Sequence, residues 1–232
     1  MRRSKHNAGC PSGRTTTAGI CYLLFMLFLL PSGLYWINDQ LNPSLSETEL
    51  NFVFYLVNFI SILLIFHDFL GRAGRQVLLE PFEFLQAVIL GFVAYYACNW
   101  VVTRLVGILV PGFTNYNDAS IAQMLGSNYL LMFVGTVILV PPVEECLYRG
   151  LIFRNLYGKS PAAAYTISIL AFAAIHILGY IGNYSALELL MAVLQYLPAG
   201  LCLAWAYTKS DTIFAPMVIH AAINYISITN LR

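Results

Sequence analysis

Long apolar runs are the feature of this sequence that most limits its fold. They follow one another with short polar turns between them, at about residues 20–37, 51–70, 84–110, 128–153, 162–181, 187–207 and 213–228. A run of about 18 or more apolar residues is long enough to cross a bilayer as a helix. Charged residues make up 10% of the chain, whereas a soluble domain averages about 25%. The sequence therefore predicts an all-α, polytopic membrane helical bundle with about seven transmembrane helices.

The charges between the runs predict how the chain crosses the membrane. Met1–Thr17 holds basic residues and no acidic one, and cytoplasmic loops of membrane proteins carry an excess of Lys and Arg. A short basic turn at Gly71–Arg75 is expected on the same side. We therefore expect a multi-pass protein with a cytoplasmic N-terminus and outer loops at residues 38–50 and 111–127. The small size and short loops favour a prokaryotic plasma membrane.

A cleaved signal peptide is the alternative interpretation of the first run. A small-residue cleavage motif is missing, and the apolar character continues past Pro31 to Ile37. We therefore expect an uncleaved first span. The five cysteines are scattered, mostly within apolar runs, which predicts small buried side chains rather than a disulfide framework or a metal cluster.

Polar residues interrupt three of the later runs. Glu144, Glu145 and Arg149 follow two prolines in the fourth run, and a histidine lies in each of the fifth and seventh, His176 and His220. A charge near the centre of a bilayer costs about 2.5–3.5 kcal/mol on insertion scales. Charges at a helix end, near the membrane surface, would need no function. Polar groups on three separate runs instead favour a site assembled inside the membrane.

Helix geometry predicts different surroundings for the two adjacent glutamates. Glu145 and Arg149 are four residues apart with the acid first, which is the favourable order for an ion pair. Glu144 has Tyr148 at that offset and projects about 100° away from the pair. Glu144 is thus left without a local cation and can serve as a base. Pro141-Pro142 removes two backbone donors, which predicts a kink with room for water.

The two histidines each share a helix face with another residue of interest, Phe172 with His176 and His220 with Asn224. A lone histidine in a membrane helix often does no more than form a hydrogen bond to a neighbouring helix. Together with a glutamate, however, these groups offer a base for water, a proton shuttle and donors for an oxyanion. Peptide hydrolysis needs this combination.

Three motifs formed by these residues resemble those of a known family. Glu-Glu-x-x-x-Arg at 144–149, Phe-x-x-x-His at 172–176 and His-x-x-x-Asn at 220–224 are similar to the motifs of the CPBP intramembrane endopeptidases. That family includes the CAAX prenyl proteases and bacteriocin-processing or self-immunity proteins. The resemblance suggests a division of the chain into a basic cytoplasmic segment, N-terminal transmembrane helices and a CPBP-like catalytic helical core, at residues 1–18, 19–126 and 127–232.

The resemblance implies a role for each motif residue. Glu144 would activate the attacking water, and His176 would help to hold or protonate it. His220 and Asn224 would form the oxyanion hole. The residues expected to support the site are Glu145, Arg149, Phe172 and Tyr148.

The function that follows is hydrolysis of a peptide bond in a membrane-associated protein or peptide, as in CAAX-type or leader-peptide processing. The expected partners are a hydrophobic or lipidated peptide or membrane protein substrate and the lipid bilayer, with no nucleic acid. One alternative is a non-catalytic membrane scaffold or a bacteriocin self-immunity protein. Another is a zinc-dependent protease in which Glu144, His176 and His220 bind the metal. Because the sequence lacks His-Glu-x-x-His and Asn224 suits a donor role, we expect no cofactor.

The depth of the two histidines poses a geometric problem. His176 lies some fifteen residues into its run and His220 about eight residues into its own. At 1.5 Å per residue, upright helices would separate them by roughly 10 Å. Tilt, or a fifth helix that starts below the membrane surface, would close this gap.

Overall fold

The computed structural model describes residues 10–231, and the secondary structure of this part is helical apart from one isolated bridge between Ile181 and Tyr184. This confirms the predicted all-α class. Most elements are α-helices, η2 and η3 are π-helical, and η4 is a 3₁₀ turn. Their order is α1 Gly13–Phe28, α2 Leu30–Asp39, α3 Glu47–Leu79, α4 Pro81–Leu109, α5 Tyr116–Ser127, α6 Tyr129–Phe133, η2 Val134–Leu139, α7 Val140–Glu144, η3 Glu145–Phe153, α8 Arg154–Tyr157, α9 Pro161–Ile175, η4 Leu178–Tyr180, α10 Ala186–Ser210 and α11 Phe214–Asn230.

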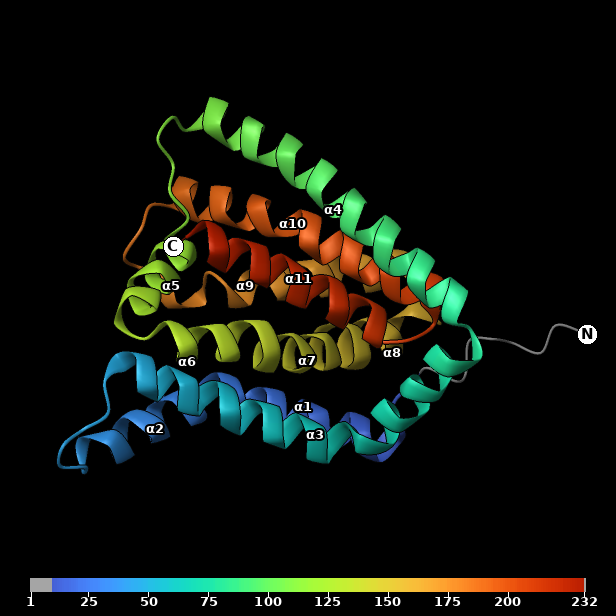
Figure 1. The fold of residues 1–232 in the computed structure, drawn as a ribbon, viewed down its shortest axis with the longest axis horizontal. Coiled ribbons are helices and arrows are strands. Elements are labelled where there is room, and N and C mark those ends of the chain that lie inside the picture. The colour runs from blue at the N-terminus through green and yellow to red at the C-terminus, as the bar shows by residue number, and fades with distance from the viewer. Residues whose placement is uncertain (1–9, 232) are drawn as a thin grey trace, which may run out of the picture.

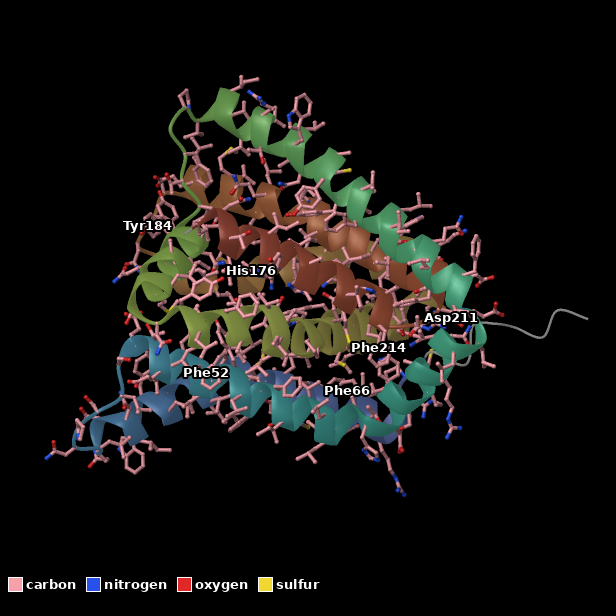
Figure 2. All side chains as sticks on the ribbon, in the orientation of Figure 1. Phe52, Phe66, His176, Tyr184, Asp211 and Phe214 are labelled. Carbon is pink, nitrogen blue, oxygen red and sulfur yellow. The ribbon has the colours of Figure 1, made fainter. Side chains whose placement is uncertain are left out.

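The helices run side by side along one direction (Figure 1). Elements α6 to α8 form one continuous rod, with α1 to α3 on one side of it and α9, α10 and α11 on the other. Helix α4 covers α10 and α11 from outside, and α5 lies across the end of the bundle where the described chain finishes. Figure 2 shows Asp211 and Phe214 at one end of the bundle and Tyr184 at the other.

Within residues 10–231, four helical rods are long and apolar enough to cross a membrane: α3, α4, α6–α8 and α10. The pair α1 and α2, bent by 47°, brings the number to five if it is one broken span. All seven predicted runs are helical, but α9 has 15 residues and α11 has 17. The count of seven transmembrane helices is therefore not confirmed.

The outer surface of the bundle is strongly apolar. Several large side chains on α3 and α4 are more than 70% exposed, namely Leu64, Leu78, Leu79, Phe82 and Ile108. Such exposure would be unfavourable in water and is expected where lipid surrounds the helices. Together with the long apolar helices, this surface identifies an integral membrane protein.

The structure moves two predicted boundaries. The expected basic turn at Gly71–Arg75 is helical, because α3 continues to Leu79 and the chain turns at Glu80, just before Pro81. A residue before proline is disfavoured in the helical conformation, and proline suits the first turn of the next helix. The basic residues Arg72 and Arg75 therefore lie near the end of α3 but do not end this helix.

The expected outer loop at 111–127 was also wrong in part, since it contains helix α5. Asn115 caps this helix by accepting a hydrogen bond from the backbone N–H of Asn117. Asn is among the best N-cap residues. Met124 and Leu125 are buried and hold α5 against the bundle.

Close helix contacts fix α4 and α9 against their neighbours. A Cβ at Gly91 of α4 would lie 2.7 Å from Cδ1 of Ile219, and one at Gly200 of α10 would lie 2.9 Å from Cγ2 of Ile169. Small residues allow membrane helices to approach closely and gain packing energy. The rod α6–α8 is the more enclosed part, with half of its most apolar window buried against 11% for α4.

Candidate active site

The two glutamates lie at the centre of the rod, where the backbone is wound more widely than an α-helix. Glu144 ends α7 and Glu145 begins the π-helical η3. The backbone N–H of Val140, just before the two prolines, reaches five residues back to Gly135 O. The expected kink thus takes the form of π-helical winding within one 29-residue rod. Such winding is rare and frequently occurs at functional sites.

Glu145 is the centre of a buried polar cluster. Its Oε1 accepts hydrogen bonds from Arg149, at 3.0 Å, and from Nδ1 of His220, at 2.8 Å. Both charged side chains are fully buried, and that of His220 is 5% exposed. Because a carboxylate only accepts, the His220 proton on this side is on Nδ1. The predicted Glu145–Arg149 pair is thus observed, and His220 joins it.

Arg149 is held by three kinds of contact. Besides Glu145, its guanidinium lies within 3.4 Å of the carbonyl oxygens of Ala199 and Gly200 in α10. Its central carbon is 4.3 Å from the ring centroid of Phe172, a cation–π contact. The cluster therefore ties the rod to α9, α10 and α11.

Glu144 faces His176 instead. The distance from Glu144 Oε2 to His176 Nε2 is 4.0 Å, and this oxygen has no hydrogen-bond partner among the described residues. His176 Nδ1 lies 2.8 Å from the carbonyl oxygen of Phe172, which can only accept, so the proton is on Nδ1 and Nε2 faces Glu144. At 18% and 16%, both side chains keep limited exposure. The local cation that Glu145 has is missing at Glu144, as predicted.

Phe172 brings the two histidines together. Its ring centroid is 4.8 Å from that of His176 and 5.8 Å from that of His220, and it makes an edge contact with Tyr148. Tyr196 of α10 stacks on His176 at 4.2 Å. Both histidines thus contact the Phe172 ring despite the predicted difference in depth. Helix α9 ends at Ile175, not near residue 181, and His176 caps it.

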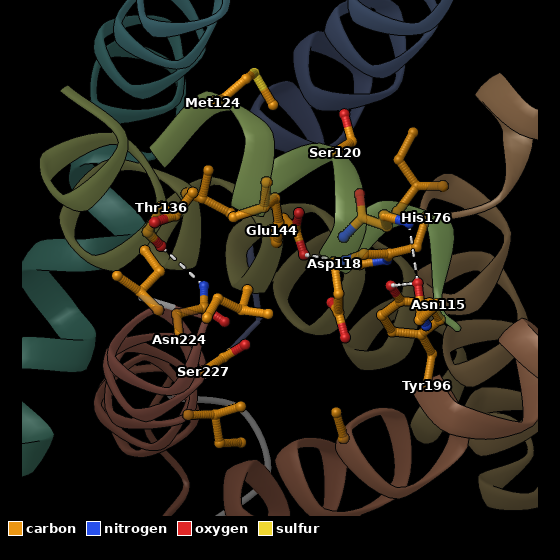
Figure 3. A pocket seen from close by; sticks show the side chains of 18 of the residues that line it. Asn115, Asp118, Ser120, Met124, Thr136, Glu144, His176, Tyr196, Asn224 and Ser227 are labelled. Carbon is orange, nitrogen blue, oxygen red and sulfur yellow. Dashed lines mark hydrogen bonds and ion pairs between the residues drawn. The ribbon is translucent and has the colours of Figure 1, made fainter. Parts of the chain in front are cut away.

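Asn224 is the remaining motif residue. Its Nδ2 donates a hydrogen bond of 2.8 Å to the carbonyl oxygen of Thr136, in the π-helical η2 (Figure 3). An amide nitrogen has two N–H groups, so one further donor remains.

A cavity of about 940 Å³ adjoins these residues. Five motif residues line it, namely Glu144, Phe172, His176, His220 and Asn224. Tyr148 instead lines a neighbouring space of about 80 Å³, which Glu144 also lines. Many of the large cavity's other lining residues are tyrosines and amides, mostly from α3, α4, α5 and α10, and the remainder are largely apolar.

Sequence reasoning missed the residues that α5 contributes. Asn115 donates to Gln195 at 2.8 Å and accepts from Tyr196 at 3.3 Å, and Asp118 projects into the cavity near His176 (Figure 3). Burial raises the pKa of Asp118, and the nearby His176 partly lowers it. The Asn-x-Asn-Asp start of a helix was the available signal.

The three residues considered for zinc do not form a converging donor set. Within residues 10–231 no group of three or more His, Cys, Asp or Glu side chains is placed to hold a metal ion. His220 directs Nδ1 at Glu145, and Glu144 and His176 are 4.0 Å apart.

One family model matches the chain, over residues 126–226, and its description is type II CAAX prenyl endopeptidase Rce1-like. The matched segment contains the rod α6–α8, α9, α10 and most of α11, and hence all three motifs. No curated protein and no solved structure matches the chain.

Proposed function

We infer that this protein is an intramembrane endopeptidase, and the match of residues 126–226 to the Rce1-like family model supports this inference. It hydrolyses a peptide bond of a membrane-associated protein or peptide, as in CAAX-type or leader-peptide processing. The observation that carries this proposal is the pairing of Glu144 with His176. An oxygen of Glu144 without a hydrogen-bond partner among the described residues faces Nε2 across 4.0 Å, at the wall of a large cavity.

The pairing suits activation of a water molecule. A separation of 4.0 Å is too long for a direct hydrogen bond, yet a water beside both atoms can donate one proton to each. His176 is held in the tautomer that accepts at Nε2, because its Nδ1 donates to Phe172 O. Glu144 removes a proton from the water, whose oxygen bonds to the carbonyl carbon. The proton passes through Glu144 or His176 to the leaving nitrogen as the C–N bond breaks.

His220 and Asn224 supply donors for the tetrahedral oxyanion. Asn224 has a second amide N–H besides the one that Thr136 O accepts. His220 donates through Nε2 when its ring is protonated, and the hydrogen bond of Nδ1 to Glu145 stabilises that charge. Glu145 and Arg149 therefore act by holding the oxyanion donor in place.

The substrate class follows from the apolar setting and from the family. A hydrophobic or lipidated peptide reaches the cavity from the bilayer, with no metal or other cofactor needed by these residues. We place the protein in a prokaryotic plasma membrane with a cytoplasmic N-terminus.

The test compares peptide termini in membranes that contain wild-type protein or Glu144→Gln. This change keeps size and hydrogen bonding but removes the base, so cleavage falls by a factor of about 10² or more. Glu80→Gln, at the α3–α4 turn and away from the cavity, is the matched control and stays active. New termini that depend on wild-type protein identify the substrates. A Glu144→Gln protein that generates the same termini as wild type is a scaffold, and the proposal is then wrong.

A further inference from the structure

The large cavity carries carboxylates, but its described lining contains no lysine or arginine. The carboxylates are those of Glu47, Asp118 and Glu144. Arg149, the arginine of the Glu-Glu-x-x-x-Arg motif, does not line the cavity and is paired with Glu145. A negatively charged substrate group that entered here would meet no lysine or arginine of this lining.

Of these three carboxylates, Asp118 lies beside the proposed reacting groups but belongs to none of the three sequence motifs. It lies in the first turn of α5, where the helix dipole favours an acid. That local benefit explains its place on the helix but not its direction, because the side chain projects into the cavity (Figure 3).

Among residues 10–231, no lysine or arginine is paired with Asp118. Its carboxylate makes no hydrogen bond or ion pair with any residue from 10 to 231, and it interacts electrostatically with His176, Tyr95, Tyr180 and Tyr196. Burial raises its pKa, as expected for a carboxylate that has lost water without gaining a fixed cation. A cation from a ligand would supply what is missing.

The position of Asp118 indicates which part of a substrate it meets. In Figure 3, Asn224 lies on one side of Glu144, and His176 with Asp118 lies on the other. In the proposed reaction Asn224 binds the carbonyl oxygen, and the proton reaches the leaving nitrogen through Glu144 or through His176, the group on the Asp118 side. The residues that follow the scissile bond therefore pass Asp118.

We propose that Asp118 selects substrates with a Lys or Arg side chain on the leaving-group side of the scissile bond. A free C-terminal carboxylate within a few residues of that bond is correspondingly disfavoured. This inference rests on the proposed function and narrows it to leader-peptide processing: the substrate is a hydrophobic or lipidated segment that continues as a basic chain. A CAAX-type tail, which ends soon after the bond with a free carboxylate, is disfavoured.

The test uses synthetic peptides in proteoliposomes. Their sequence is taken from a Glu144-dependent cleavage site, with an N-terminal myristoyl chain and with Lys, Gln or Glu placed in turn at the second residue after the scissile bond. Each is made with an amidated and a free C-terminus three residues after the bond. We expect kcat/KM to fall in the order Lys, Gln, Glu by roughly tenfold overall, the size of one charge pair in a partly wet site. Amidated peptides are cleaved faster than free acids.

Variants assign the preference to Asp118. Asp118→Asn removes the difference between the Lys and Glu peptides, and Asp118→Lys reverses it. Asp39→Asn, an exposed acid at the same end of the bundle that does not line the cavity, leaves the wild-type order unchanged. Asp118→Glu keeps the order and serves if Asp118→Asn does not fold.

The outcomes separate this inference from the proposed function. Equal cleavage of the three peptides by wild type, or a preference for Glu, overturns the role of Asp118 while cleavage still depends on Glu144. Cleavage that survives Glu144→Gln overturns the proposed function itself.

Discussion

His220 donates its Nδ1 proton to Glu145 across 2.8 Å, although the two residues are 75 positions apart in the chain. The same carboxylate oxygen accepts from Arg149, one turn away in the rod. One buried oxygen thus joins a local ion pair to a histidine on another helix. The Glu145–Arg149 pair therefore supports the candidate site through His220 and does not only stabilise the rod α6–α8.

The first prediction separates the two glutamates by their effect on folding. Glu145→Ala leaves Arg149 buried and unpaired, which costs roughly 3–5 kcal/mol of unfolding free energy. Arg149→Ala is expected to destabilise the protein similarly. Glu144→Ala leaves stability nearly unchanged, because Glu144 has no fixed cation and retains 18% exposure. Thermal unfolding in detergent measures the difference, and equal melting temperatures for the three variants contradict it.

The second prediction concerns the oxyanion donors. Asn224→Ala removes one donor, so kcat falls by roughly 10²–10³ while substrate binding is retained. Ser227→Ala, which alters another polar residue of the same cavity on α11, is the control and keeps near wild-type kcat. Single-turnover kinetics with an identified peptide provide the measurement. A loss of binding with unchanged kcat would place Asn224 in substrate recognition instead.

The third prediction concerns orientation in the membrane. A cysteine at Ser44, in the exposed connection between α2 and α3, reacts with a membrane-impermeant thiol reagent in intact cells. A cysteine at Lys159, in the exposed turn between α8 and α9, does not react until the membrane is opened. The α2–α3 connection and the end of α8 lie at opposite ends of the bundle (Figure 1). The reverse labelling pattern would place the N-terminus outside.

The fourth prediction addresses metal dependence. Purified protein contains no stoichiometric zinc, and its activity survives prolonged chelation followed by gel filtration. The physical reason is that in the proposed mechanism Glu144 and His176 hold the water without a metal, and that His220 is bonded to Glu145 through Nδ1. Activity that is lost on chelation and returns only with Zn²⁺ would assign these side chains to ligand roles.

The parts of the site that the sequence predicted are those set by local geometry. Residues four apart on a helix face the same way whatever surrounds them, which gave the Glu145–Arg149 pair and the separate position of Glu144. The wider winding of η3 keeps this relationship. The roles of the remaining site residues were then predicted from the resemblance of the three motifs to a known family.

The contacts that the sequence could not predict depend on how helices are tilted and rotated against one another. The bond from His220 to Glu145 needs a particular register between α11 and the rod, and no periodicity encodes it. The role of α5 was missed because a short polar segment resembles a loop, although Asn115 marked a helix start. Asp118 was therefore not considered as a cavity residue.

The close approach of Gly91 to Ile219 links the candidate active site to α4, a helix that lies outside the matched residues 126–226. Any side chain at Gly91 would push against Ile219, whose Cδ1 lies 2.7 Å from the position of the added Cβ, and Ile219 is the neighbour of His220. Helix α4 thus packs against the neighbour of His220, a residue to which the proposed function gives a role in the oxyanion hole. The matched segment 126–226 therefore packs against a helix outside it: without α4 it would keep every motif but would expose the side of α11 that Gly91 approaches.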